Sequence, residues 1–121
     1  MNLLVDVGNT RAKSCRYSND TGLGKVQEVK SIESHTEFNK LVLAKVTTQD
    51  VSDITKGIKY QNLVEVEVKN NEFGVECGYS NINNLGIDRW IGILGAELLF
   101  PKQNVIVVDA GTATTVEFLT A

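Results

Sequence analysis

Two short turns carry the residue types best suited to bind phosphate groups. Each turn begins with the Asp at the end of an apolar run and continues through Gly. The first is Asp6-Val7-Gly8-Asn9-Thr10, with Lys13 shortly after it, and the second is Asp109-Ala110-Gly111-Thr112. Because Gly has no Cβ, backbone N–H groups of such a turn can approach a polyphosphate closely, while the carboxylate holds a metal ion or its water. Either turn alone is also typical of a plain hairpin whose Asp and Asn satisfy turn backbone groups. The presence of two copies favours phosphate binding.

The segment Gly86-Ile87-Asp88-Arg89 offers a different chemistry, the binding and deprotonation of a substrate. The Asp88 carboxylate can accept a proton from a substrate hydroxyl, and the Arg89 guanidinium can bind an anion. An Asp in the first turn of a helix is also favoured by the helix dipole, so a simple capping role stays open for Asp88. Tyr79, in the loop before this segment, can line a small-molecule pocket or cover the core.

Other phosphate-binding motifs are missing from the chain. There is no G-x-x-x-x-G-K-[ST] segment, which excludes a P-loop, and no G-x-G-x-x-G segment follows a strand. If phosphate binds here, hairpin turns bind it.

The first third of the chain predicts an antiparallel meander that positions the first Asp turn. The expected strands are residues 3–7, 12–17 and 25–32, separated by segments rich in Gly, Asn and Asp. Asp6 then lies at the end of the first strand, directly before the turn.

The middle third is less periodic. Ser34 and Glu37 form a capping-box pattern that predicts a short helix over residues 34–40, and residues 41–46 then predict a strand rather than the end of that helix. A helix over residues 52–60 and a strand over 62–69 follow. Residues 70–85 are rich in Asn and Gly and predict a loop.

The last third predicts a helix and a hairpin that position the remaining chemistry. Apolar residues recur at helical spacing until Pro101 ends the helix: Ile87, Trp90, Ile91, Leu94, Leu98 and Leu99. Four consecutive β-branched residues at 105–108 predict a strand buried on both faces, with a hairpin partner over residues 115–119. Asp109 lies between these strands, at the start of the second Asp turn.

The same strand, Asp turn and strand therefore appear twice. This repetition predicts a first domain over residues 1–103 and the start of a second, related domain over residues 104–121. We expect the carboxylates of Asp6 and Asp109 to face one cleft.

Composition excludes several classes of protein. The 121 residues are 42% hydrophobic and 22% charged, which is typical of a soluble globular protein. The 12 Lys and Arg residues are scattered among 15 Asp and Glu residues, so we expect no nucleic-acid partner. No apolar run approaches the roughly 20 residues of a membrane helix, and the start MNLLVDVGNT has no basic segment leading into a long apolar stretch, so we expect a cytoplasmic protein. Cys15 and Cys77 have no metal-site or redox spacing, and we interpret them as reduced thiols.

In order and spacing, these motifs resemble type III pantothenate kinase. That family includes the Baf-type proteins and belongs to the acetate and sugar kinase, Hsc70 and actin superfamily. The resemblance rests on the first Asp turn with Lys13, on Tyr79 seven residues before Gly86, and on the second Asp turn continued by Ala113 and Thr115. It implies an α/β fold of actin-like (ribonuclease H-like) type, a mixed sheet with an antiparallel three-stranded start and flanking helices.

The resemblance also implies an activity, the ATP-dependent phosphorylation of pantothenate to 4'-phosphopantothenate, the first step of coenzyme A biosynthesis. It makes Asp88 the catalytic base, assigns magnesium to Asp6, directly or through water, and assigns a monovalent cation, potassium or ammonium, to Asp109. The implied pantothenate-binding residues are Tyr79, Gly86, Ile87, Asp88 and Arg89. The implied ATP-binding residues are Asp6, Val7, Gly8, Asn9, Thr10, Arg11, Ala12, Lys13 and Thr112. Family members are homodimers with this pocket near the subunit interface.

The sequence departs from the family pattern at two points. Family members often have Pro after Tyr-x-Asn, where Tyr79-Ser80-Asn81 is followed here by Ile82. They are also considerably longer and carry their adenosine-binding motif in the remainder, so we expect residues 1–121 to be an N-terminal piece that is inactive alone.

Two alternatives to pantothenate phosphorylation stay open. The turns alone permit another small-molecule kinase of the superfamily, such as a sugar or acetate kinase, but the spacing of Tyr79 and Gly86-Ile87-Asp88-Arg89 argues for pantothenate. A non-catalytic Baf-type regulator is the other alternative. The joint presence of Asp6, Asp88 and Asp109 argues against it, because a pure binding protein needs no base.

Overall fold

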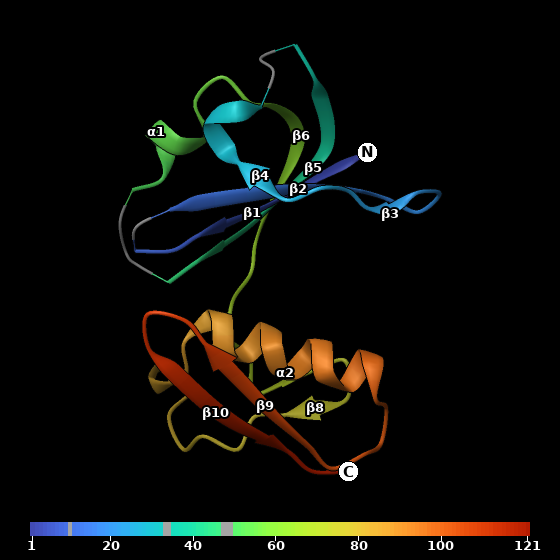
Figure 1. Ribbon diagram of the computed structural model, residues 1–121, viewed down its shortest axis with the longest axis vertical. Coiled ribbons are helices and arrows are strands. Elements are labelled where there is room, and N and C mark those ends of the chain that lie inside the picture. Colours follow the sequence, from blue (N-terminus) through green and yellow to red (C-terminus); the bar gives the residue numbers. More distant parts are fainter. Residues whose placement is uncertain (10, 33–34, 47–49) are drawn as a thin grey trace. The chain divides into compact units, whose positions relative to one another are not determined.

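The structure of the chain, a computed structural model, describes residues 1–121 apart from residues 10, 33–34 and 47–49. It divides into two compact units, Met1–Val66 and Glu67–Ala121, each of which we describe by itself (Figure 1). The first unit contains β1 (Asn2–Val7), β2 (Ala12–Ser18), β3 (Gly22–Leu23), β4 (Gln27–Glu28), the 3₁₀ helix η1 (Val29–Ser31), β5 (Glu37–Lys45), α1 (Ser52–Thr55) and β6 (Lys59–Glu65).

The first unit is built on one mixed sheet. Its strand order is β3-β2-β1-β5-β6, and β4 pairs with β2 beside this path. β1 and β2 are antiparallel, whereas β1 pairs in parallel with β5, and β5 in parallel with β6. The chain is therefore an α/β protein with both parallel and antiparallel strand pairs.

Alternating apolar residues of β1 and β5 explain where this sheet buries its core. Leu3 and Val5 lie in register beside Leu41 and Leu43, and all four side chains are buried. Residues directly opposite one another share a face of a sheet, so these side chains form one apolar layer. The packed cluster is completed by Val7, Val29, Phe38 and Val51.

The strands predicted at residues 3–7 and 12–17 are confirmed by β1 and β2, but the third predicted strand is broken. Within residues 25–32 only the two residues of β4 pair with β2, and η1 follows at once. The Val29 side chain is buried in the core cluster. The chain leaves the sheet edge there because this side chain must reach the apolar face.

The helix predicted over residues 34–40 is wrong where the structure describes it, because β5 begins at Glu37. Ser34, the other half of the capping pattern, lies outside the described residues. Pairing with strands on both sides and burial of Phe38 and Leu41 override the local pattern. The strand predicted over residues 41–46 is confirmed as far as Lys45.

The next two predicted elements have the right order but the wrong bounds. The helix predicted over residues 52–60 ends at Thr55, since Gly57 adopts a φ of 87°, which a helix cannot contain. The strand predicted over residues 62–69 is β6, which begins at Lys59 and ends at Glu65.

The second unit consists of a helix packed on a hairpin, with a long loop before them. Its elements are β7 (Asn71–Glu72), β8 (Val75–Glu76), the 3₁₀ helix η2 (Ile82–Asn84), α2 (Ile87–Leu99), β9 (Val105–Ala110) and β10 (Thr114–Leu119). Antiparallel pairing joins β7 to β8 and β9 to β10. Residues 70–85, expected as a loop, thus contain a small hairpin and a helical turn.

The predicted helix is confirmed, but its predicted apolar stripe is only partly buried. α2 begins after Gly86 and ends before Pro101. Its buried side chains are Ile87, Trp90, Ile93 and Ala96, whereas Ile91, Leu98 and Leu99 are exposed. The buried face of α2 packs on the hairpin. The two are close together at Gly92, where an added Cβ atom would lie 3.6 Å from Val107 Cγ1.

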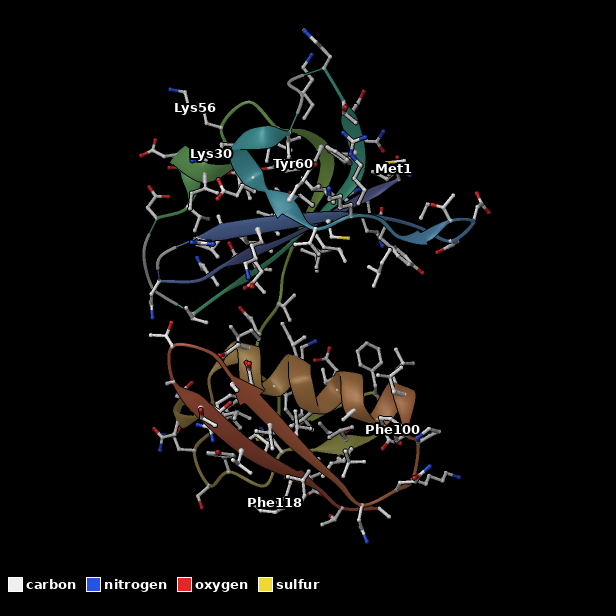
Figure 2. All side chains as sticks on the ribbon, in the orientation of Figure 1. Met1, Lys30, Lys56, Tyr60, Phe100 and Phe118 are labelled. Carbon is white, nitrogen blue, oxygen red and sulfur yellow. The ribbon has the colours of Figure 1, made fainter. Side chains whose placement is uncertain are left out.

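β9 was expected to be buried on both faces, which is wrong for the described residues. The inward face carries Val105 and Val107, both partly buried. The outward face is exposed and apolar, with Phe118 at 69% of its maximal exposure (Figure 2). Only one side of this two-stranded hairpin has a helix packed on it, so alternate residues stay in contact with solvent. The exposed apolar residues are Ile106, Val108, Val116 and Phe118.

Each unit contains one of the two cysteines. Cys15 lies on β2, where its thiol donates to the carbonyl of Gly24 at 3.1 Å, and Cys77 follows β8. Both are free and partly buried. Among the described residues, no helix is both long and apolar enough to cross a membrane.

Candidate functional site

The first Asp turn positions a carboxylate and an ammonium group beside each other. Asp6 is the second-last residue of β1, and its register partner across the antiparallel pair is Lys13 of β2. Both residues are exposed and share one face of the sheet. The turn closes because the Gly8 N–H donates to the carbonyl of Arg11 at 2.9 Å. Thr10, also expected to bind phosphate, lies outside the described residues.

The second Asp turn repeats this arrangement in the other unit. Asp109 is the second-last residue of β9, with Thr115 of β10 as its register partner, and the Gly111 N–H donates to the carbonyl of Ala113 at 3.1 Å. The repeated strand, Asp turn and strand are therefore present. Asp6 and Asp109 belong to different units, so their predicted common cleft stays a prediction.

The N-terminus of α2 presents Asp88 to solvent. Gly86 is the N-cap residue, Asp88 lies in the first turn, and the cap has no side-chain hydrogen bond. Asp88 is exposed, and its carboxylate has no hydrogen bond or ion pair with any described residue. A helix N-terminus carries a partial positive charge that favours anions. The carboxylate is thus available to a ligand rather than used as a cap.

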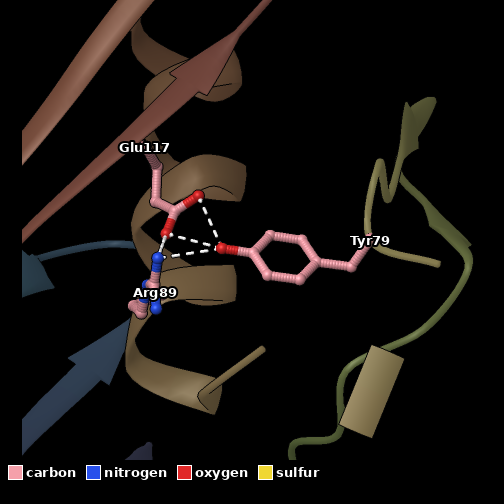
Figure 3. A network of polar contacts seen from close by, with 3 residues as sticks. All are labelled: Tyr79, Arg89 and Glu117. Carbon is pink, nitrogen blue, oxygen red and sulfur yellow. Dashed lines mark hydrogen bonds and ion pairs between the residues drawn. The ribbon is translucent and has the colours of Figure 1, made fainter. Parts of the chain in front are cut away.

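Arg89 belongs to a network that joins three elements of the second unit (Figure 3). Its Nη2 atom forms an ion pair with Glu117 Oε1 and donates to the Tyr79 hydroxyl at 2.8 Å. The Tyr79 hydroxyl in turn donates to Glu117, 3.2 Å from Oε1 and 3.4 Å from Oε2. The structure therefore brings the side chains of Tyr79 and Arg89 together and adds Glu117, whereas their place in one pantothenate pocket stays a prediction.

The electrostatics of this network depend on the buried carboxylate. Glu117 is 7% exposed, and a buried charge is tolerated only when it is paired and hydrogen-bonded. Burial is the largest cause that raises the pKa of the Tyr79 hydroxyl. The hydrogen bond to Glu117 and the charge of Glu117 raise this pKa further. Tyr79 is thus held in its protonated, hydrogen-bond-donating form. The Arg89 guanidinium carbon also lies 5.8 Å from the centre of the Tyr79 ring.

Sequence reasoning missed Glu117. A signal was present, because Glu117 stands two residues from Leu119 and two from Thr115, in phase with the inward positions of a strand. A carboxylate at an inward position needs a cationic partner, and Arg89 supplies it.

The first turn of α2 and the second Asp turn lie at one end of the second unit. Glu117 pairs with Val107 in the hairpin, so Asp109, two residues beyond Val107, shares the face on which α2 packs. The register places Asp109 towards the hairpin turn, and the first turn of α2 lies at the same end (Figure 1). The helix N-terminus and the second Asp turn therefore lie at the same end, and Glu117 lies two positions further along the same face of the hairpin.

The loop that carries Tyr79 is fixed without the Pro that family members often have. The Asn81 side chain accepts from the Asn83 N–H at 3.0 Å and caps η2. Ile82 is the first residue of η2, a position where Pro is favoured because its N–H is not needed. Ile82 therefore occupies a position that would also suit Pro.

Each unit contains a cavity. In the first unit, a cavity of about 580 Å³ is bordered by Arg11, Lys30 and Lys56 together with Glu28 and Asp53. In the second unit, Tyr79 and Glu117 form part of the wall of a cavity of about 760 Å³, whose apolar lining includes Val75, Leu85, Trp90 and Ile93. Within the described residues, no group of three or more His, Cys, Asp or Glu side chains could hold a metal ion.

Comparison with known proteins agrees with this assembly of motifs. The model of the family "Type III pantothenate kinase" matches residues 2–121. The chain is 32% identical to the type III pantothenate kinase of Pseudoalteromonas translucida, where 98% of this chain matches 51% of that protein. It is 31% identical to that of Colwellia psychrerythraea and 35% identical to that of Flavobacterium johnsoniae, over 53% and 52% of those proteins. These alignments include 100% and 98% of this chain, which spans about half the length of these curated relatives. The chain belongs to the type III pantothenate kinase family.

Proposed function

We propose that this chain supplies the pantothenate-binding and phosphate-binding elements of an enzyme that phosphorylates pantothenate to 4'-phosphopantothenate, the first step of coenzyme A biosynthesis. The observation that carries this proposal is the network of Tyr79, Arg89 and Glu117, in which Arg89 directly follows Asp88, an exposed residue of the first turn of α2. Pantothenate combines a hydroxyl with a carboxylate, and this site combines a base with an anion-binding guanidinium.

Asp88 is the proposed base. It accepts the proton of the pantothenate hydroxyl as the hydroxyl oxygen forms a bond to the γ-phosphorus of ATP, and the bond from that phosphorus to the ADP oxygen breaks. Arg89 and Tyr79 bind the substrate in the proposed pocket, together with the backbone of Gly86 and Ile87. The positive end of α2 favours the negative charge that gathers there.

The first Asp turn is the proposed site for the phosphates of ATP. Magnesium is typically held by one or two carboxylates plus substrate phosphates, and the exposed Asp6 fits such a role. Magnesium neutralises phosphate charge when bound. The Lys13 ammonium, beside Asp6, can contact phosphate oxygens, as can polar groups of the proposed ATP-binding residues Val7, Gly8, Asn9, Thr10, Arg11 and Ala12.

The second Asp turn is the proposed site of a monovalent cation, potassium or ammonium. The exposed Asp109 carboxylate and the carbonyl groups of its turn are oxygen donors, which suit such ions. Thr112, in the same turn, is a proposed ATP contact. The turn lies at the same end of the second unit as the first turn of α2, which contains Asp88 (Figure 1).

The proposal extends to the fold and the assembly. The strand order β3-β2-β1-β5-β6, with an antiparallel start and parallel continuation, supports an actin-like fold. The first domain is proposed to span residues 1–103, with a second beginning at residue 104. The enzyme is proposed to be a cytoplasmic homodimer, and residues 1–121 alone are expected to be inactive.

A coupled ADP-release assay on the full-length protein that contains this chain tests the function. With ATP, magnesium and potassium present, pantothenate should give turnover, whereas acetate and simple sugars should not. Loss of turnover on removal of potassium, with recovery on addition of ammonium, would support the proposed cation. Turnover with a sugar or acetate but not with pantothenate would contradict the proposal, as would a folded protein with no kinase activity.

A further inference from the structure

Of the three residues in the network, Glu117 is the one to which the proposed reaction assigns no role. It lies in the middle of β10 on the face covered by α2, and it is almost fully buried. Both of its carboxylate oxygens accept hydrogen bonds, and the donors come from the loop at Tyr79 and from the first turns of α2 at Arg89 (Figure 3). One side chain thus ties both proposed substrate-binding side chains to the hairpin.

Without the Glu117 carboxylate, the surroundings of Arg89 would fix the orientation of its side chain only in part. Its side chain is 30% exposed, against 9% for that of Glu117. Among the described residues, Nη2 makes the polar contacts with Glu117 and Tyr79, whereas Nε is buried and has no hydrogen-bond partner. Buried donors without a partner are rare, so the orientation of Arg89 depends on the Glu117 pair rather than on a full set of hydrogen bonds.

We propose that Glu117 is a positioning residue for pantothenate, holding Arg89 and Tyr79 in the geometry that binds the substrate carboxylate. The inference rests on the proposed function and adds a residue to it. A guanidinium recognises a carboxylate through a fixed fork of N–H donors, so its orientation controls affinity.

Two opposing effects decide what removal of the Glu117 charge does. Loss of a nearby negative charge favours an anionic substrate, but it also leaves the Arg89 cation without its buried partner. An unpaired cation is costly inside a protein, and the partial exposure of Arg89 gives its side chain a route into water. The guanidinium therefore turns away from the pocket, and substrate binding weakens.

The effect should fall on binding more than on turnover. Asp88 has no hydrogen bond or ion pair with Glu117 or with any other described residue, so the proposed base does not depend on the network. In the full-length enzyme we expect Glu117→Gln to raise KM for pantothenate roughly tenfold or more, with kcat changed less than about threefold. The matched control is Glu67→Gln, which neutralises an exposed carboxylate of the same unit that has no partner in the described part of the chain.

A double variant separates positioning from a general loss of structure. If Glu117 acts through Arg89, then Glu117→Gln should raise KM far less in an Arg89→Gln background than in the wild type. Additive effects of the two substitutions would overturn the proposal, as would an unchanged or lowered KM in Glu117→Gln.

The outcome distinguishes this inference from the proposed function. A wild-type enzyme without pantothenate-dependent turnover contradicts the function itself, whereas an active wild type with a normal Glu117→Gln variant contradicts only the role of Glu117. If the Gln variant melts well below the wild type, Glu117→Asp takes its place, since it keeps the charge but is one methylene shorter. We expect that variant to fold and to have a KM between those of the wild type and Glu117→Ala; a wild-type KM would overturn the proposal.

Discussion

A methyl group on Gly86 would lie 2.7 Å from Asp88 Oδ1, closer than side-chain carbon and oxygen atoms approach in proteins. The backbone of Gly86 itself, at a φ of −64° and a ψ of 146°, is open to every residue. The absence of a side chain at Gly86 therefore leaves room for the Asp88 carboxylate, and the backbone conformation at this position does not require Gly.

We expect Gly86→Ala to lower kcat for pantothenate roughly 10- to 100-fold in the full-length enzyme, because the Asp88 carboxylate must move away from the new methyl group. The helix should remain intact, since the backbone conformation suits Ala. Steady-state kinetics measure the effect, and circular dichroism checks the helix. Normal kcat with an intact helix would show that the position of the carboxylate is unimportant.

Asp88→Asn should lower kcat far more than it weakens pantothenate binding. A general base contributes roughly 10²- to 10⁴-fold, and it does so in the transition state. The amide of Asn keeps the size of the side chain but accepts no proton. Comparison of kcat with the dissociation constant of pantothenate makes the distinction, and near-normal turnover would reduce Asp88 to a charge near a helix end.

The pKa of Tyr79 provides a test of the hydrogen bond between Tyr79 and Glu117 that does not depend on kinase activity. Burial and the Glu117 carboxylate both raise this pKa from its ordinary value of 10.0, so Glu117→Gln should lower it. The change is measured by titrating tyrosinate absorbance in each protein against its own Tyr79→Phe variant, which cancels Tyr17 and Tyr60. An unchanged pKa in Glu117→Gln would contradict the hydrogen bond between Tyr79 and Glu117.

The same shift predicts a loss of stability in alkali. Because the folded state favours neutral Tyr79, the stability that this group contributes is fully present below pH 10 and is lost as the pH rises above that value. Tyr79→Phe should therefore lose less stability than the wild type over the same alkaline range.

Gly95→Ala should raise the free energy of unfolding by about 0.5–1 kcal/mol, the usual gain when Ala replaces Gly inside a helix. A Cβ at Gly95 would meet no atom within 4 Å among the described residues. Urea denaturation measures the change, and this variant is also the control for Gly86→Ala. Destabilisation in the full-length protein would show that another segment packs against this position.

The sequence predicted the parts of the fold that local chemistry determines. The Asp turns follow from apolar strands that end in Asp and Gly, and α2 follows from helical spacing that ends before Pro101. β5 was predicted poorly because its first residues look helical locally, and only pairing with β1 and β6 makes them a strand. Strand pairing over long sequence separations leaves little local signal.

The candidate site likewise contains residues that could be predicted from the sequence and one that could not. Tyr79 and Arg89 could be found from residue type and spacing. Glu117 could not be found so easily, since its role depends on which face of β10 meets α2, and that face is determined by tertiary packing.

The placement of one cysteine in each unit makes the chain suitable for distance measurement by spin labelling. Cys15 and Cys77 are the two cysteines of residues 1–121, and both are free and partly buried. A pair of nitroxide labels on them reports the separation of the two units directly, by pulsed electron paramagnetic resonance. Spectra recorded with and without ATP and pantothenate would then reveal whether ligands narrow the distribution of that separation.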